Sequence, residues 1–136
     1  MKALFTVPHD AVTVEYGLAG PVWLEQTGII ITINNCGMQH TLENAKEQMA
    51  AFDKVYKGIP RPLIVDFTLV RSMQREARAY YSSDDNSLKI KALAIVTGSN
   101  IGRLVGNFFI GLNSSDIPTK IFSNGEEAKK WAIQFV

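Results

Sequence analysis

The feature that most constrains the fold is the stretch of residues 90–112, where an apolar run leads into a glycine-containing turn and then a second apolar pattern. Residues 92–97 (ALAIVT) are almost wholly apolar, which is typical of a central parallel strand covered on both faces. Residues 98–100 (GSN) predict a turn whose serine or asparagine caps the following helix. A strand, a turn and a helix in this order form the unit of a layered α/β fold, and most of the chain repeats them.

Two spacings are present in the helix after this turn. Apolar residues recur at helical intervals and predict the face toward the core: Ile101, Leu104, Val105, Phe108 and Leu112. Gly98, Gly102 and Gly106 recur at a spacing that fits neither a dinucleotide-binding fingerprint nor a Walker loop. We therefore interpret Gly102 and Gly106 as a stripe of small residues that lets the helix pack closely against a neighbour, rather than as a place where a ligand approaches.

An opening hairpin followed by alternating helices and strands is predicted for the whole chain. Strands are expected at residues 11–17, 22–26, 29–34, 62–68, 92–97 and 119–122. Helices are expected after Thr41 as N-cap, at about residues 72–83, at 101–112, and after a capping box of Ser123 and Glu126. The predicted fold class is α/β, a single domain over residues 1–136 with a mixed sheet of four or five strands and four helices.

Composition indicates an ordinary globular chain, with 46% hydrophobic and 20% charged residues. The formal net charge of +1 provides no general attraction to nucleic acid or to an anionic membrane. No apolar run approaches the roughly 20 residues that span a bilayer, and the start of the chain, MKALFTVPHD, does not read as a secretory signal. The single cysteine, Cys36, excludes an internal disulfide. We expect a cytoplasmic protein with no nucleic-acid partner and no integral membrane segment.

Three stretches carry a family resemblance: residues 75–78 (REAR), residues 92–107, and residues 118–131 (PTKIFSNGEEAKKW). They resemble a group of small bacterial proteins, mostly uncharacterised, that are similar in fold to the STAS domain of anti-sigma-factor antagonists and sulfate-transporter tails. The resemblance covers nearly the whole chain. It implies a sheet of four or five strands with helices largely on one face, and a binding or regulatory role rather than catalysis.

The phosphorylation motif of that family is incomplete in this chain. Anti-sigma-factor antagonists carry a phosphorylatable serine in an Asp-Ser-Ser-Gly-like turn after the strand that here contains Asp66. The corresponding residues 68–74 read TLVRSMQ, so the flanking aspartate and glycine are missing around Ser72. We interpret Ser72 as the N-cap of the following helix rather than as a phosphorylation site.

Residues with catalytic or metal-binding chemistry are few and scattered. His9 and His40 are isolated, and Cys36 and His40 lack the second ligand pair that a zinc site needs. A thiol or esterase activity at Cys36 would rest on residue type alone. Asp66 is expected to cap a backbone turn or to hold an arginine of the next helix. We expect no catalytic residues, no metal and no cofactor.

A candidate ligand site is expected where the carboxyl ends of the parallel strands meet. Free amides at helix starts and nearby arginines would hold an anionic group there. In the alternative interpretation these arginines are solvated or pair with Glu76, Asp84 and Asp85. The candidate ligand-binding residues are Arg71, Arg75, Arg78, Gly98, Ser99, Asn100 and Arg103.

An apolar excess on two predicted helices suggests an interface. The consecutive residues 108–110 (FFI) cannot all face the sheet, and the same holds for the tyrosines at 80 and 81. The candidate interface residues are Tyr81, Asn107, Phe109 and Ile110. The leading hypothesis is a non-enzymatic, STAS-like binding module that acts through a regulatory protein partner and forms a homodimer. The alternative is a domain that binds a small anionic ligand or a lipid at the strand ends.

Overall fold

The computed structural model describes residues 1–112 and 117–136, and the side chains of residues 108, 109, 111 and 112 lie outside that description. The strands are β1 (Thr13–Tyr16), β2 (Pro21–Leu24), β3 (Ile30–Ile33), β4 (Met38–His40), β5 (Arg61–Asp66), β6 (Val70–Met73), β7 (Ile90–Val96) and β8 (Thr119–Phe122). The helices are α1 (Leu42–Tyr56), α2 (Arg75–Tyr81), α3 (Asp84–Ser87), α4 (Asn100–Leu112) and α5 (Gly125–Ala132), followed by a 3₁₀ turn at Ile133–Phe135.

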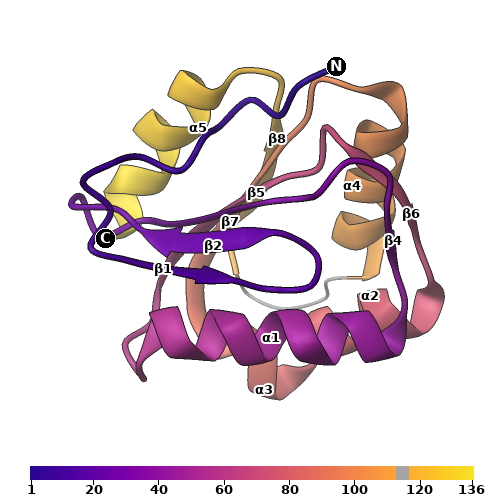
Figure 1. Cartoon of the computed structure of the whole chain (residues 1–136), viewed down its shortest axis with the longest axis horizontal. Helices are drawn as coiled ribbons and strands as arrows, with labels where there is room; N and C mark the ends of the chain where they lie inside the picture. The colour runs from indigo at the N-terminus through magenta and orange to yellow at the C-terminus, as the bar shows by residue number, and fades with distance from the viewer. Residues whose placement is uncertain (113–116) are drawn as a thin grey trace.

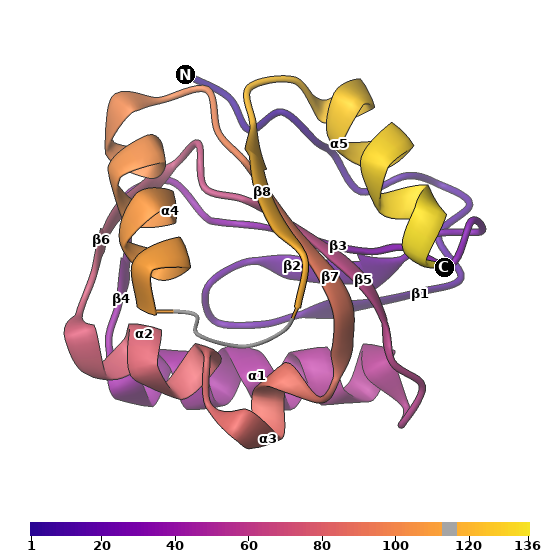
Figure 2. The same cartoon turned by 180° about the vertical axis from the view of Figure 1, so that it is seen from behind.

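The main sheet is mixed and has six strands in the order β1-β2-β3-β5-β7-β8. Strands β1, β2 and β3 pair antiparallel, whereas β3, β5, β7 and β8 pair parallel. The opening hairpin and the α/β class are therefore confirmed, and the sheet has more strands than the four or five predicted. Figure 1 shows α5 on one side of this sheet and α1 on the other, and Figure 2 shows β8 beside β7.

Each face of the sheet has its own hydrophobic core. One face packs Ile31, Ile64 and Ala94 against Ala128 and Ala132 of α5. The other face packs against α1, α2 and α4 in two clusters of side chains. Strand β7 is buried from Ala92 onward because it lies between both cores, as its apolar run predicts.

Residues 70–73, which we predicted to lie around the start of a helix, are a strand instead. Strand β6 pairs parallel with β4, with Gln39 opposite Ser72 and His40 opposite Met73. Ser72 is exposed within this strand, so its prediction as an N-cap is wrong. Gln74 is the N-cap of α2 and makes no side-chain capping bond. The long-range pairing with β4 decides this segment, and local spacing does not reveal it.

The caps of the other helices can be compared directly with the predictions. Thr41 is confirmed as the N-cap of α1, because its Oγ1 accepts a hydrogen bond from the amide of Asn44 at 3.1 Å. The cap of α5 lies one residue later than predicted. Asn124 Oδ1 accepts from the amides of Glu126 and Glu127 at 2.8 and 3.1 Å, and Ser123 is not the capping residue.

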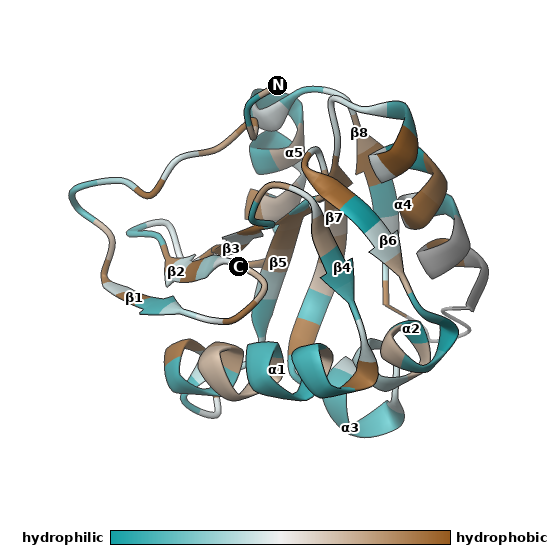
Figure 3. Cartoon of the chain, turned by 45° about the vertical axis from the view of Figure 1, so that its right-hand side comes forward, coloured by the Kyte–Doolittle hydropathy of each residue, from teal (hydrophilic) through white to brown (hydrophobic). Residues whose placement is uncertain are grey.

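Helix α4 presents only part of the predicted apolar face to the sheet: Val105 is buried as predicted, and the side chains of Phe108 and Leu112 lie outside the described residues. Ile101 and Leu104 are 50% and 55% exposed, whereas Gly102, Val105 and Gly106 are buried. A Cβ on Gly102 would overlap the Phe67 carbonyl oxygen. The glycine stripe therefore brings the helix onto the sheet, which confirms the packing interpretation and turns Ile101 and Leu104 outward. Figure 3 shows these first turns of α4 with hydrophobic residues in brown.

Across residues 1–112 and 117–136, no helix combines the length and hydropathy needed to cross a lipid bilayer.

Candidate functional site

A cavity of about 90 Å³ lies between the main sheet and the helices α1, α2 and α3. Side chains of one sheet face form its floor because alternate residues of a strand point to the same side. Leu63 and Val65 are only half-buried although β5 is a central strand, since both line this cavity. The apolar side chains of its wall are Ala19, Val22, Ile33, Met49, Phe52, Leu63, Val65, Phe67, Ile90, Leu93, Ile95 and Ile117.

A cavity of this size is costly to a small domain. Protein interiors are packed as densely as organic crystals, with few voids larger than a water molecule. Engineered apolar cavities of about 150 Å³ stay dry and bind benzene or xenon. The space here is smaller, so we expect it to admit an apolar guest no larger than a single ring.

One corner of the cavity wall is polar and consists of Asn34, His40 and Tyr81. Asn34 Nδ2 donates to the Asp66 carbonyl at 3.0 Å, so Asn34 Oδ1 is left to accept from His40 Nε2. With its proton on Nε2, the imidazole accepts at Nδ1 from the Tyr81 hydroxyl at 2.9 Å. The three side chains thus form one directional chain of hydrogen bonds.

Burial keeps both ionisable groups of this corner neutral. Burial lowers the pKa of His40 to about 4, so the ring carries no charge near neutral pH. Burial also raises the pKa of Tyr81 above its usual value, and the neighbouring Tyr80 raises it further. The ring of His40 meets the rings of Phe67 and Tyr81 edge-on, with centroids 6.5 and 5.6 Å away. The imidazole is therefore held in one tautomer and one orientation.

Gln48 of α1 joins the cavity wall to the opening hairpin. Its Oε1 accepts from the Ala19 amide at 2.9 Å, and its Nε2 donates to the Gly20 carbonyl at 3.1 Å. Because Gln48 is buried, both ends of its amide need such partners. These bonds fix α1 over the sheet, and with it the roof formed by Met49 and Phe52.

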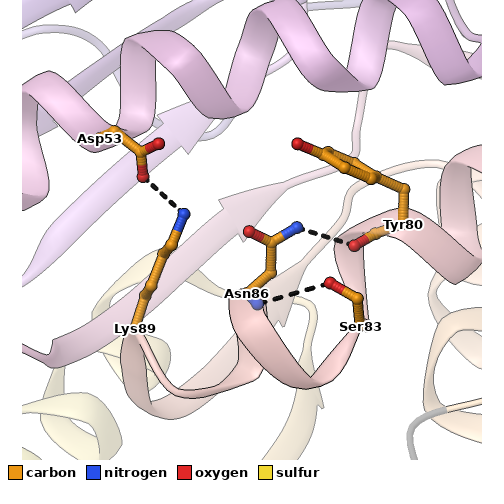
Figure 4. Close-up of polar contacts among 5 residues, drawn as sticks. All are labelled: Asp53, Tyr80, Ser83, Asn86 and Lys89. Atoms are coloured by element: carbon orange, nitrogen blue, oxygen red, sulfur yellow. Dashed lines mark hydrogen bonds and ion pairs between the residues drawn. The ribbon is translucent and has the colours of Figure 1, made fainter.

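Helix α3 covers another side of the cavity through Asn86 and Ser87, next to Ser82 at the C-terminal end of α2. Figure 4 shows how it is attached: Asn86 Nδ2 donates to the Tyr80 carbonyl at 2.7 Å, and the Asn86 amide donates to Ser83 Oγ at 3.4 Å. In the same view, Lys89 Nζ forms an ion pair with Asp53 of α1 at 2.7 Å. These contacts hold α3 between α1 and the end of α2.

The predicted arginine site lies elsewhere, on the exposed sides of β6, α2 and α4. Arg71, Arg75 and Arg103 are exposed there, and Asn100 is exposed as the first residue of α4. Arg78 is half-buried and donates from Nη1 to the Met73 carbonyl at 2.9 Å.

Three amides around the turn before α4 already have side-chain partners within the protein. The Gly98 amide donates to Thr68 Oγ1 at 2.9 Å, and the Ser99 amide donates to Thr97 Oγ1 at 3.1 Å. The Gly102 amide donates to Ser99 Oγ at 3.0 Å, which makes Ser99 the capping side chain of α4. The predicted residues thus lie on neighbouring elements, but the amides of Gly98, Ser99 and Gly102 donate to side-chain oxygens of the protein.

The predicted interface residues divide between the inside and the outside of the molecule. Tyr81 points inward to His40 and lines the cavity, which explains why two tyrosines fit side by side. Asn107 is exposed, and Ile110 is half-buried against the core on the α4 side. The side chain of Phe109 lies outside the described residues.

Asp66 is one of the few buried charged or polar side chains, with 1% of it exposed. Its Oδ2 accepts from the amides of Leu4 and Phe5 at 2.6 and 3.3 Å, and its Oδ1 accepts from the Thr68 amide at 2.9 Å. It therefore caps backbone, the first of the two roles expected for it, and ties the N-terminal segment to the end of β5.

The remaining candidates for chemistry lie apart. Cys36 and His9 are exposed. Among the residues that the structure describes, no three His, Cys, Asp or Glu side chains are grouped to hold a metal ion. Sequence reasoning left His40 isolated and did not name Asn34 as a site residue. Their partners become visible only when β4 and α2 are placed against the sheet.

The six-stranded mixed sheet with its opening hairpin belongs to the class of SpoIIAA-like α/β domains. A crystal structure of an uncharacterized protein of the DUF3478 family with a SpoIIAA-like fold, from Shewanella loihica, aligns with a TM-score of 0.53 and 16% sequence identity. The alignment covers 94% of this chain and 98% of that protein, so the likeness extends over the whole fold. The fold expected from the STAS resemblance is confirmed.

The particular family is identified from the sequence. Residues 22–136 match the family described as a domain of unknown function, DUF7793, and the chain belongs to that family. None of the curated proteins compared with the chain matches its sequence.

Proposed function

We propose that this protein is a non-enzymatic binding domain whose ligand is a small apolar molecule held in the cavity between the sheet and α1. The observation that carries this proposal is the cavity itself, whose wall is apolar except for a few hydrogen-bonded side chains. Small-molecule sites in proteins typically combine an apolar wall with a few well-placed polar groups. The place of the ligand differs from the strand-end site expected from the arginines.

The size of the cavity sets the expected affinity. Burial of each methylene group of a guest contributes about 0.8 kcal/mol, and the loss of translational and rotational freedom opposes binding. A guest about the size of benzene is therefore expected to bind with a Kd of about 1 mM, or about 4 kcal/mol. A guest with a longer apolar part that extends beyond the cavity would bind more tightly.

Toluene titrations that follow amide chemical shifts by NMR test this proposal. We expect shifts confined to residues around the cavity, and a rise in Tm with toluene concentration. The variant Val65→Leu adds one carbon to the cavity wall and should weaken toluene binding severalfold. Val105→Leu is the matched control, because Val105 is buried in the core but does not line the cavity. If toluene has no effect on the wild-type protein, or affects both variants equally, the proposal fails.

The exposed apolar pair on α4 supports a second candidate function, association with a protein partner, with a second copy of the chain as the simplest case. Ile101 and Leu104 lie one helical turn apart and are each about half exposed. Contiguous exposed apolar patches on a surface mark interaction sites, and this pair would form part of one. This surface differs from the one first predicted at residues 107–110.

Sedimentation of concentrated protein tests the α4 surface. If the chain associates through α4, Ile101→Asp with Leu104→Asp should convert a dimer to a monomer. Leu88→Asp is the matched control, because Leu88 is 75% exposed and lies outside α4, at the C-terminal end of α3. A wild-type protein that is monomeric at about 0.1 mM, where a dimer with a micromolar Kd would persist, contradicts self-association.

A further inference from the structure

The described residues that line the cavity include no Asp, Glu, Lys or Arg. Its two ionisable side chains, His40 and Tyr81, are both neutral near pH 7 for the reasons given above. A charged group taken from water into such a space costs several kcal/mol unless an opposite charge or hydrogen bonds compensate. The wall thus offers no counter-ion for a carboxylate, a phosphate or an ammonium group.

The direction of the hydrogen bonds decides which polar group the corner could recognise. The chain runs from the Tyr81 hydroxyl to His40 Nδ1, and from His40 Nε2 to Asn34 Oδ1. The hydrogen of the Tyr81 hydroxyl is therefore used within the protein. A phenolic oxygen that donates its hydrogen keeps the capacity to accept one from elsewhere. Tyr81 Oη is the end of the chain and an acceptor.

The aliphatic hydroxyl groups of the wall also donate their hydrogens within the protein. Ser82 Oγ donates to the Arg78 carbonyl at 2.8 Å, and Ser87 Oγ donates to the Ser82 carbonyl at 3.3 Å. Thr32 Oγ1 donates to the Pro21 carbonyl at 2.9 Å. Each hydroxyl hydrogen already has a protein acceptor, whereas the hydroxyl oxygens keep lone pairs. The hydroxyls of the cavity therefore present acceptors rather than donors.

We infer that the ligand of this cavity is a neutral apolar molecule with one hydrogen-bond donor, such as a hydroxyl or an N–H group, and that Tyr81 Oη accepts from it. This inference rests on the proposed function and narrows it to one ligand class. The ligand class inferred for the cavity is neutral and therefore differs from the anionic ligand that the arginines suggested. The role of His40 is to position Tyr81, because His40 holds the hydroxyl hydrogen away from the ligand.

Four small probes of similar size test the inference on the wild-type protein: phenol, toluene, fluorobenzene and benzoate. All are titrated at pH 7.5, where phenol is neutral and benzoate is charged. We expect phenol to bind about three- to tenfold more tightly than toluene or fluorobenzene, as one net hydrogen bond predicts, and benzoate not to bind. Toluene binding as tightly as phenol, or benzoate binding in the cavity, would overturn the inference and leave the proposed function intact. If none of the four probes binds, the proposed function fails as well.

Two variants test the assignment to Tyr81. His40→Leu combined with Tyr81→Phe removes both ends of the Tyr81–His40 hydrogen bond and leaves Asn34 as the remaining polar side chain of that corner. We expect this variant to bind toluene and to lose the preference for phenol. Tyr80→Phe is the matched control, because Tyr80 neighbours Tyr81 but does not line the cavity, and it should retain the preference. A phenol preference that survives in the double variant contradicts the role of Tyr81, and the wild-type titrations remain decisive if the variant does not fold.

Discussion

At the scale of single residues, the molecule depends on a few buried polar side chains with complete hydrogen bonding. Gln48 and Asn34 each satisfy both ends of their amides, and His40 has a partner at each ring nitrogen. An unsatisfied buried polar group costs about 1–3 kcal/mol. Loss of one partner should therefore destabilise the fold far more than loss of a surface contact.

His40 makes stability depend on pH in a defined window. Its pKa is about 4 in the folded protein and about 6.5 when unfolded, because burial disfavours the charged ring. Between these values the unfolded chain binds more protons, so stability falls as the pH falls. The slope should approach about 1.4 kcal/mol per pH unit, with about 3 kcal/mol lost by pH 4.

Urea unfolding of the wild-type protein at several pH values between 4 and 7 checks this prediction. The variant His40→Gln should be less stable at pH 7 and should lose this part of the slope. His9→Gln is the control, since His9 is exposed, and it should keep the wild-type slope. Equal slopes in the wild-type protein and in His40→Gln would show that His40 does not titrate as described.

At the scale of secondary-structure elements, close backbone approach decides how α4 lies on the sheet. A helix usually packs through its large apolar residues. Here the buried stripe of α4 contains Gly102 and Gly106, and the helix lies close enough for Gly102 to face the Phe67 carbonyl. Ile101 and Leu104 then turn to the surface, where they form the candidate interface.

The two glycines should respond differently to substitution by alanine. Gly102→Ala places a Cβ against the Phe67 carbonyl oxygen, and overpacking of this kind costs about 1–3 kcal/mol. Gly106→Ala places its Cβ 3.0 Å from Ile95 Cγ2, a tight contact that is relieved by a shift of a few tenths of an ångström, and gains up to about 1 kcal/mol of helix propensity.

The free energies of unfolding of the two variants test this packing. We expect Gly102→Ala to be clearly less stable than the wild-type protein and Gly106→Ala to be close to it. Equal stabilities of the two variants would mean that α4 does not approach the Phe67 carbonyl as closely as described.

At the scale of the whole molecule, the N-terminal segment packs against α5, the last α-helix of the chain. Phe5 is buried between the sheet and α5, where its ring lies near Gly125 and 5.5 Å from Lys129 Nζ. The amides of Leu4 and Phe5 are bound by Asp66 at the end of β5. One carboxylate thus holds a segment that covers the core on the α5 side.

Asp66→Asn should release this segment. An asparagine has one acceptor oxygen, so it cannot serve three backbone amides in the manner of the carboxylate. We expect a loss of about 1–3 kcal/mol and faster hydrogen exchange at the amides of Leu4 and Phe5. Asp10→Asn, at an exposed position, is the control and should leave both amides protected. Unchanged exchange in Asp66→Asn would rule out this anchoring role.

Local patterns along the chain were sufficient for much of the architecture. The apolar run of β7, the opening hairpin, the N-cap Thr41 and the glycine stripe of α4 are all properties of neighbouring residues. Their physical causes act over one strand or one helical turn, so the sequence by itself determined them. The same reasoning gave two roles for Asp66, and the structure bears out the first of them, the capping of backbone amides.

Only the tertiary structure decided the two-stranded sheet of β4 and β6 and the candidate site. Strand β6 exists because β4 pairs with it, and His40 meets Tyr81 from 41 residues away. The outward face of α4 likewise depends on the approach of Phe67 from β5's end. Such contacts are set by the packing of elements that are distant in the sequence, so the periodicity of the residues does not predict them. The cavity follows from the same cause, because it is the space left where α1, α2 and α3 meet one face of the sheet.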